Sequence, residues 1–432
     1  MYELLTLSIF ILILAVFVAT GQSLIIALSL GLLIFVIYAF IKGNNPKRIG
    51  SMILNGVKSA KTILIVFGLI GILTALWRAG GTIPFLIYHS IRFIRPDFFV
   101  LYAFILCSMV SILTGTSFGT ASTMGVVCMS IGLALGIDPF LTGGAILSGV
   151  FFGDRCSAIS SSALLVSELT QTNLFINIKN MLKTTMVPLL ITMIVYAVTG
   201  HINSTTVVSS ESVFIYSDSF NLYWWVSIPA ALVILLSLFK FKVKRTLIIS
   251  IIASVFVCIY AQKISVPEII SIAIMGYEAE NPTLGPIING GGLVSMVRSA
   301  SIVGISSSYF GIFRNTEILL EIKRWIRNLS LRTTSFFAIF LSSILMSAVS
   351  CNQTLATMLT FELNDDLVPD RYKLAIYLEN TVIVIAPLIP WSIAGAFPLT
   401  TVGAPASSIL YAVYLYILPL YGLLTERDKP NS

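Results

Sequence analysis

The stretch Thr114-Gly-Thr-Ser-Phe-Gly-Thr-Ala-Ser122 interrupts a long apolar run at residues 97–136. Irregular backbone is expected at this stretch, because it is rich in glycine, serine and threonine. Backbone N–H and C=O groups left bare in hydrocarbon cost several kcal/mol each, so irregular backbone is tolerated only inside protein or beside a water-filled cavity. When the run is treated as one re-entrant hairpin, the basic loops that follow fall mostly on consistent sides of the membrane. We therefore predict that this stretch is the tip of a re-entrant hairpin.

The composition of the whole chain indicates a membrane protein. Hydrophobic residues make up 57% of the 432 residues, charged residues make up only 10%, and the mean hydropathy is +0.96. Soluble domains carry about a quarter charged residues. Apolar runs long enough for a spanning helix of about 20 residues recur from end to end. We predict an all-α polytopic protein of the cell (inner) membrane, surrounded by lipid, with about ten crossings plus two hairpins.

Several classes of function are disfavoured by the sequence. The five cysteines lie in or beside apolar runs without a Cys-x-x-Cys pair, and there are only two histidines, His89 and His201. The sequence has no Ser/His/Asp or His-Glu-x-x-His pattern of a hydrolase. The net charge of +7 is scattered through loops, which is typical of topology control and not of nucleic-acid binding. We expect no enzyme, no cofactor and no nucleic-acid partner.

Basic loops suggest the orientation of the chain in the membrane. The densest short basic loops lie at residues 42–48 and 240–245. Positively charged loops stay in the cytoplasm. This places the N-terminus in the cytoplasm, two crossings before the first loop, and we place the C-terminus there as well.

The second half of the chain repeats the layout of the first. A span, an amphipathic stretch, a polar break and a long interrupted span follow one another twice. The paired segments are 56–78 with 292–314, 82–96 with 317–328, 114–122 with 350–354, and 145–161 with 375–391. The charge rule puts the first amphipathic arm outside and the second, strongly basic arm inside. We therefore predict inverted structural repeats, each with a re-entrant hairpin and a discontinuous helix, as in secondary transporters.

This layout divides the chain into four parts. They are an N-terminal two-helix hairpin (1–50), a first inverted repeat (51–200), a linker loop with connecting helices (201–262) and a second inverted repeat (263–432). The repeats contain four polar segments at equivalent places: 115–122, 153–162, 350–354 and 386–392. Unwound carbonyls and hydroxyls suit a hard cation such as Na⁺, and helix N-termini suit a carboxylate. Close helix packing explains any single Ser or Thr more simply, but four matched segments favour binding.

Charged residues inside the apolar spans are the sharpest candidates, because each costs at least ~2.5 kcal/mol at the membrane centre unless it is paired or hydrated. Asp154 is our first candidate for the cation ligand and proton carrier. The alternative explanation of this buried charge is an ion pair between Asp154 and Arg155. Glu379, next to Asn380, either carries a coupling proton or lies shallow near the cytoplasmic end. Lys61 and Arg298 fall at nearly equivalent places in the two repeats. Each either neutralises an acidic site or binds a substrate carboxylate, or it extends its charge to the membrane surface.

Four motifs occur in order along the chain. They are Trp77-Arg-Ala-Gly-Gly-Thr-Ile-Pro84, Thr114-Gly-Thr-Ser-Phe-Gly-Thr120, Gly144-Ala-Ile-Leu-Ser-Gly-Val-Phe-Phe-Gly-Asp154 and Ala386-Pro-Leu-Ile-Pro-Trp391. Together they resemble motifs of the NhaC family of sodium/proton antiporters, within the wider ion-transporter superfamily, and the resemblance covers most of the chain. It implies a sodium-coupled carrier with inverted repeats and two hairpins. The family also includes malate/lactate exchangers and proposed amino-acid carriers.

The chain departs from the family pattern where charge matters. Ser161, Asn352 and Asn380 stand where the family often has acidic residues, and Ser392 stands where it has an asparagine. Fewer carboxylates leave fewer places to carry a proton. These departures weaken the antiporter interpretation and raise the chance that sodium drives an organic solute instead.

Our leading hypothesis is elevator-like Na⁺/H⁺ antiport, in which Asp154 binds either Na⁺ or H⁺. The remaining oxygen ligands are expected from Thr116, Ser117, Ser157, Ser160, Asn352, Gln353 and Thr354. The alternative is a Na⁺-coupled symporter or exchanger of a small organic acid or amino acid, held by the same polar segments. A homodimer is expected only by analogy with elevator-like carriers.

Overall fold

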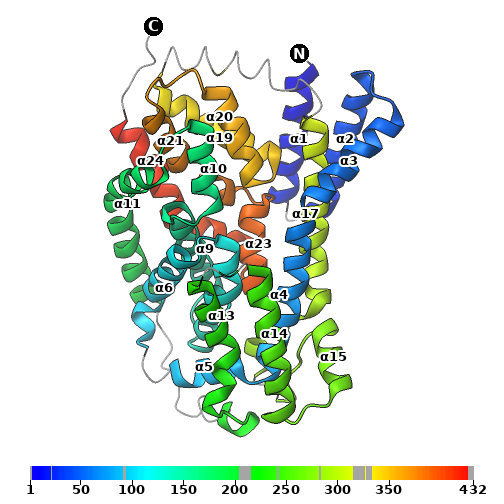
Figure 1. Cartoon of the computed structure of the whole chain (residues 1–432), viewed down its shortest axis with the longest axis vertical. Helices are drawn as coiled ribbons and strands as arrows, with labels where there is room; N and C mark the ends of the chain where they lie inside the picture. Colours follow the sequence, from blue (N-terminus) through cyan, green and yellow to red (C-terminus); the bar gives the residue numbers. More distant parts are fainter. Residues whose placement is uncertain are drawn as a thin grey trace.

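A computed structural model of the chain (Figure 1) describes residues 2–20, 22–90, 94–203, 216–239, 241, 243–281, 284–314, 326 and 333–426. Within these ranges all regular structure is helical, apart from one isolated β-bridge between Tyr277 and Gly290. The predicted arm at 317–328 lies outside the described residues except for Ile326, and the predicted basic loop lies partly outside them at residues 240 and 242.

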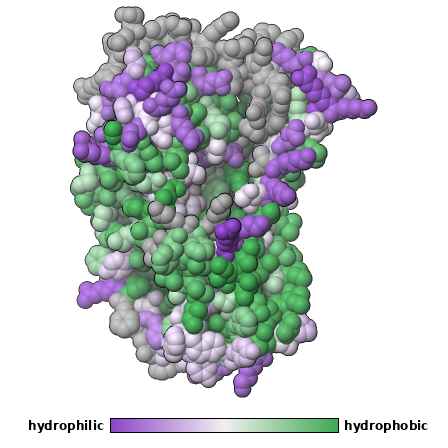
Figure 2. All heavy atoms as spheres, in the orientation of Figure 1, coloured by the Kyte–Doolittle hydropathy of each residue, from purple (hydrophilic) through white to green (hydrophobic). Residues whose placement is uncertain are grey.

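Long apolar helices confirm the all-α membrane class. By length and composition six helices among the described residues are able to cross a membrane, or up to seven if a bent pair counts as one span. They are α2 (Leu24–Ile41), α4 (Lys61–Ala79), the segment Pro96–Thr114, the segment Ser117–Ala134, α11 (Leu174–Asn203) and α14 (Val243–Tyr260). Figure 2 shows apolar side chains over most of the middle of one face, with hydrophilic ones gathered mainly toward the upper end. The number of ten crossings stays a prediction.

The first polar break is the tip of a hairpin. Its arms are α6 (Phe99–Thr114) and, after the short α7 (Ser117–Thr120) and a π-helical turn at Ala121–Gly125, α8 (Val126–Ala134). A Cβ at Gly132, near the end of α8, would lie 2.9 Å from the Phe99 ring at the start of α6. The chain therefore turns back at the tip and returns to the level at which it entered, while the re-entrant nature of this hairpin stays a prediction.

The second polar break has the same form. The arms α19 (Ser335–Ser350) and α20 (Gln353–Asn364) meet at Cys351, and the Ser335 hydroxyl at the far end donates to the Leu367 carbonyl at 3.5 Å. Figure 1 places α19 and α20 in the upper part of the molecule and α6 in its lower half. The matching tips support a repeat. The inverted orientation of the two repeats and the boundaries of the four parts of the chain stay predictions.

Both long interrupted spans are discontinuous helices, as predicted. In the first, α9 (Pro139–Cys156) gives way to extended backbone at Ser157, and α10 (Ser161–Thr170) begins after the cap Ser160. The second runs from α21 (Arg371–Asn380) through α22 (Val382–Ile385) and a 3₁₀ turn at Ala386–Leu388. It then bends by 55° before α23 (Ile393–Val402).

Three helices pack closely together beside the hairpins. The helices α3 (Pro46–Ser59) and α4 together pack along α17 (Gly292–Arg314). The approach depends on glycine, because a Cβ at Gly56 would lie 2.2 Å from the Ser307 carbonyl oxygen. We call α3, α4 and α17 the scaffold. The other helices are α1 (Tyr2–Ala19), α5 (Thr82–Ser90), α13 (Ile228–Leu238), α15 (Val266–Met275), α16 (Gly285–Ile288) and α24 (Val413–Thr425).

Candidate ion-binding site

Asp154 lies two residues before the end of α9, and its carboxylate is held by hydroxyls from two other segments. Ser117 of α7 donates to Oδ2 at 3.3 Å, and Ser160 donates to Oδ1 at 2.9 Å. The side chain is only 3% exposed. The carboxylate thus connects α9, the break that follows it and the tip of the first hairpin.

Small residues of α9 bring the carboxylate to the hairpin. A Cβ at Gly153 would lie 2.3 Å from Cβ of Ser111, and one at Gly149 would lie 2.6 Å from the Phe104 carbonyl oxygen. Ser111 also donates to the Val150 carbonyl at 2.5 Å. Any larger side chain at these glycines would push α6 away, so the glycines of α9 are what permits the approach.

A cavity of about 100 Å³ opens beside Asp154, and both hairpin tips line it. The lining residues are Ile63 of α4, Thr116, Ser117, Phe118, Asp154, Ser161, Asn352, Gln353, Thr354, Ile393 and Ala394. A water molecule takes about 30 Å³ in the liquid, so the cavity has room for a small cation with a few waters. Carboxylate, hydroxyl and amide oxygens are the ligands that hard cations prefer.

Six of the predicted ligands line this cavity: Asp154, Thr116, Ser117, Asn352, Gln353 and Thr354. Ser160 bonds Asp154 without lining the cavity. Ser157 points elsewhere, because its hydroxyl donates to the Ile112 carbonyl of α6 at 2.6 Å. Lys61 and Arg298 are exposed and line neither this cavity nor its neighbour.

The two hairpin tips have the same backbone geometry. Gly115 and Cys351 adopt left-handed conformations with φ of 63° and 54°, and an extended residue follows each of them. These extended residues, Thr116 and Asn352, accept hydrogen bonds from the backbone N–H groups of Gly119 and Leu355. Each tip therefore ends one helix and caps the next, which points the N-terminus of a helix at the cavity.

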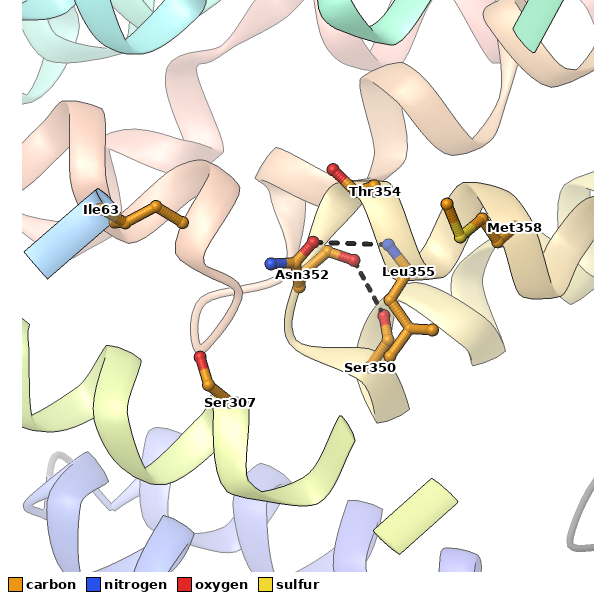
Figure 3. Close-up of a pocket in the computed structure, with 7 residues that line it drawn as sticks. All are labelled: Ile63, Ser307, Ser350, Asn352, Thr354, Leu355 and Met358. Atoms are coloured by element: carbon orange, nitrogen blue, oxygen red, sulfur yellow. Dashed lines mark hydrogen bonds between the residues drawn. The ribbon is translucent and has the colours of Figure 1, made fainter. Parts of the chain in front are cut away.

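A second cavity of about 250 Å³ adjoins the first (Figure 3). It lies between the second hairpin and the scaffold, and its lining residues are Ile63, Ser307, Ser350, Asn352, Thr354, Leu355 and Met358. Three of these, Ile63, Asn352 and Thr354, line both cavities. The sequence did not point to Ile63 or Ser307. Ile63 is one of many apolar residues in a spanning helix, and Ser307 is one of several consecutive serines, so neither shows a local sign of a binding site.

Arg155 is fully buried and is not the ion-pair partner of Asp154, so that explanation was wrong. Among the described residues no ion pair joins it to a carboxylate. Its guanidinium donates to neutral oxygens on three helices. They are the Glu379 carbonyl at 3.1 Å, Asn380 Oδ1, Thr184 Oγ1 at 3.1 Å, Thr185 Oγ1 at 2.5 Å and Tyr414 Oη at 3.4 Å. The side chain ties α9 to α11, α21 and α24.

Glu379 and Asn380 lie outside the cavity. Asn380 is occupied by the bond from Arg155. Glu379 is completely buried in the protein, while its depth in the membrane stays a prediction. Within the described part of the chain, neither oxygen of its carboxylate has a hydrogen-bond partner.

Comparisons with known proteins agree on one family. A family model described as the Na⁺/H⁺ antiporter family matches residues 2–167 and 149–425. The Na⁺/H⁺ antiporter NhaC of Alkalihalophilus pseudofirmus is 30% identical over 385 residues, which cover 87% of this chain and 83% of that protein. The malate-2H⁺/Na⁺-lactate antiporter of Bacillus subtilis is 28% identical over 86% of this chain and 82% of its own length. The arginine/ornithine antiporter ArcD of Halobacterium salinarum is 28% identical over 82% and 76%, respectively.

Proposed function

Because the chain belongs to the Na⁺/H⁺ antiporter family, we propose that this secondary antiporter exchanges cytoplasmic Na⁺ for external H⁺ at Asp154. The observation that carries the proposal is the buried Asp154 carboxylate beside a cavity lined by oxygen-bearing side chains of both hairpin tips. A carboxylate that holds either Na⁺ or a proton, but not both, couples the two flows through competition for one site. The ligands are Asp154 and Ser117, with Thr116, Asn352, Gln353 and Thr354 around the cavity.

The moving unit of the proposal consists of both hairpins and both discontinuous helices. It carries the cavity past the scaffold, in an elevator-like cycle, so that Asp154 faces one side of the membrane at a time. The cavity between the second hairpin and the scaffold supports this division, because it lies on the boundary across which the unit slides. The cytoplasmic side is the upper end in Figure 1, where the start of α1 and the basic junction of α2 and α3 lie. The homodimer stays an expectation by analogy.

Exchange of a small organic acid or amino acid, driven by Na⁺, is the second candidate. It is favoured by the 250 Å³ cavity, which is larger than a cation needs and adjoins the Asp154 cavity. The hydroxyls of Ser307 and Thr354 and the amide of Asn352 face it beside Ile63, Leu355 and Met358 (Figure 3). None of the described residues that line it carries an ionisable side chain.

One vesicle experiment tests both candidates. In everted membrane vesicles with an acidic interior, adding Na⁺ should release protons, as reported by a pH-sensitive dye. We expect Asp154→Asn to abolish this Na⁺-dependent movement, because an amide neither balances the Na⁺ charge nor carries a proton. Asp138→Asn is the matched control: Asp138 is an exposed cap at the other end of α9, and asparagine caps as well as aspartate.

The outcomes separate the proposals. Full activity of Asp154→Asn would disprove the role of Asp154. Proton movement that begins only when an organic acid or amino acid is added with Na⁺ would replace the first candidate with the second.

A further inference from the structure

Glu379 has an environment that the exchange at Asp154 does not explain. Its side chain is 0% exposed, and neither carboxylate oxygen has a hydrogen-bond partner among the described residues. Buried polar groups are almost always paired, and an isolated ionised carboxylate in an apolar interior is strongly disfavoured. The surroundings shown by the structure therefore suit the protonated, neutral form of Glu379.

The nearest cation does not satisfy this carboxylate. Arg155 donates from Nε to the backbone carbonyl of Glu379 at 3.1 Å, and its other N–H groups go to Asn380 and to hydroxyls of Thr184, Thr185 and Tyr414. Its positive charge is thus held next to Glu379 without a direct bond to the carboxylate. This arrangement stabilises the ionised form of Glu379 once its proton has left, because the positive charge of Arg155 is already in place.

The charged groups around Glu379 are few. Arg155 of α9 bonds the backbone carbonyl of Glu379, and Asp154 and Cys156 are the neighbours of Arg155 in the chain. Of the helices packed against α21, α24 contributes Tyr414, which bonds Arg155, while α19 and α22 carry no ionisable residue. The charged side chains of α10, α11 and α20 are exposed: Glu168, Lys179, Lys183 and Glu362. On α21 itself, Arg371 and Lys373 lie near the helix start, and Tyr377 bonds Glu426.

We propose that Glu379 is a second proton-binding carboxylate of the transport cycle, which gives up its proton when Na⁺ occupies the cavity at Asp154. The inference rests on the proposed function. With both carboxylates protonated, the Asp154–Arg155–Glu379 cluster carries a net charge of +1. With Na⁺ bound and both carboxylates ionised, its net charge is zero.

This charge count sets the stoichiometry. Two protons enter on the two carboxylates for each Na⁺ that leaves on Asp154, so one net positive charge crosses the membrane per cycle. The repulsion between the two carboxylates couples Na⁺ binding to proton release. While Asp154 is ionised it disfavours ionisation of Glu379, and Na⁺ removes this repulsion by neutralising Asp154.

The test is the number of protons released per bound Na⁺. Purified protein in weakly buffered detergent solution is titrated with NaCl across a pH series, with choline chloride as the blank. A pH dye reports protons, and radioactive ²²Na⁺ reports binding. We expect the wild type to exceed one proton per Na⁺ at its maximum and Glu379→Gln to stay at or below one. Glu362→Gln, an exposed glutamate of α20, should match the wild type.

Each outcome is decisive. A Glu379→Gln protein that releases as many protons per Na⁺ as the wild type overturns the inference, as does a wild type that never exceeds one. Glutamine copies the protonated side chain, so Glu379→Gln should purify as a folded protein. If it collapses while Glu379→Asp folds, the carboxylate is ionised and structural, and the inference fails. If Asp154→Asn still binds Na⁺ and releases protons, the exchange site itself is wrong, whatever Glu379 does.

Discussion

Asp154 and Arg155 are adjacent in sequence, but their side chains contact different helices. Successive residues on an α-helix point about 100° apart, since a turn takes 3.6 residues. Asp154 therefore faces the first hairpin, while Arg155 faces α11, α21 and α24. A buried arginine with only neutral acceptors positions helices, and its charge remains available to the two carboxylates near it.

At this residue we predict that Arg155→Lys destabilises the protein even though it keeps the charge. Lysine has three donors on one nitrogen and cannot reproduce the planar fork that reaches Asn380, Thr185 and Glu379 together. Losing two charge-assisted bonds should lower the free energy of unfolding by about 3 kcal/mol. The unfolding midpoint in detergent, followed by size-exclusion chromatography after heating, measures the change.

The control for this change is Arg298→Lys, which alters an exposed arginine of α17 and should leave the midpoint unchanged. An equal midpoint for Arg155→Lys and the wild type would show that the hydrogen bonds of Arg155 contribute little to stability.

Among the helical elements, the hairpin tips depend most directly on backbone conformation. Gly115 ends α6 with φ of 63°, a region that costs residues with a Cβ about 1–2 kcal/mol. A Cβ at this position would also lie 2.7 Å from the carbonyl carbon of Ile159. The tip therefore needs glycine for its turn and for its contact with the break after α9.

We predict that Gly115→Ala shifts the first tip, weakens the bond from Ser117 to Asp154 and slows exchange by tenfold or more. A tenfold change corresponds to about 1.4 kcal/mol, which the strain at this position reaches. Gly304→Ala in α17 is the control, because nothing lies within 4 Å of a Cβ placed there. Initial rates of Na⁺-dependent proton movement in vesicles compare the two, and equal rates would contradict the role of the tip.

For the whole molecule, the boundary between the moving unit and the scaffold is the feature to test. Ser307 of α17 and Leu355 of the second hairpin line the 250 Å³ cavity from opposite sides of that boundary. We predict that bridging cysteines at these two positions with a bifunctional methanethiosulfonate reagent stops exchange, and that a reductant restores it. Vesicle assays before and after reduction measure both effects.

A pair within the scaffold provides the comparison. A Cβ at Gly68 of α4 would lie 3.3 Å from a methyl group of Leu293 of α17, so cysteines at Gly68 and Leu293 can be bridged without crossing the boundary. This bridge should leave exchange intact. If bridging Ser307 to Leu355 is equally harmless, the hairpin does not move against the scaffold.

The sequence by itself determined the membrane class, the two hairpin tips and the two broken spans, and it singled out Asp154 as the candidate. Each of these follows from local chemistry: runs of apolar residues, small residues that end helices, cap residues such as Thr116 and Asn352, and one aspartate amid apolar neighbours. Such signals lie within a few residues of the feature that they specify.

Only the tertiary structure decided which side chains face the cavity. Ser160 reaches Asp154 whereas Ser157 turns to α6, and Ile63 and Ser307 bring the scaffold to the site. The Glu379 carboxylate is buried with no hydrogen-bond partner among the described residues. These outcomes depend on how helices far apart in the chain pack and on the direction in which each residue leaves its helix. A single sequence does not contain that information in any local pattern, because it arises from contacts between segments hundreds of residues apart.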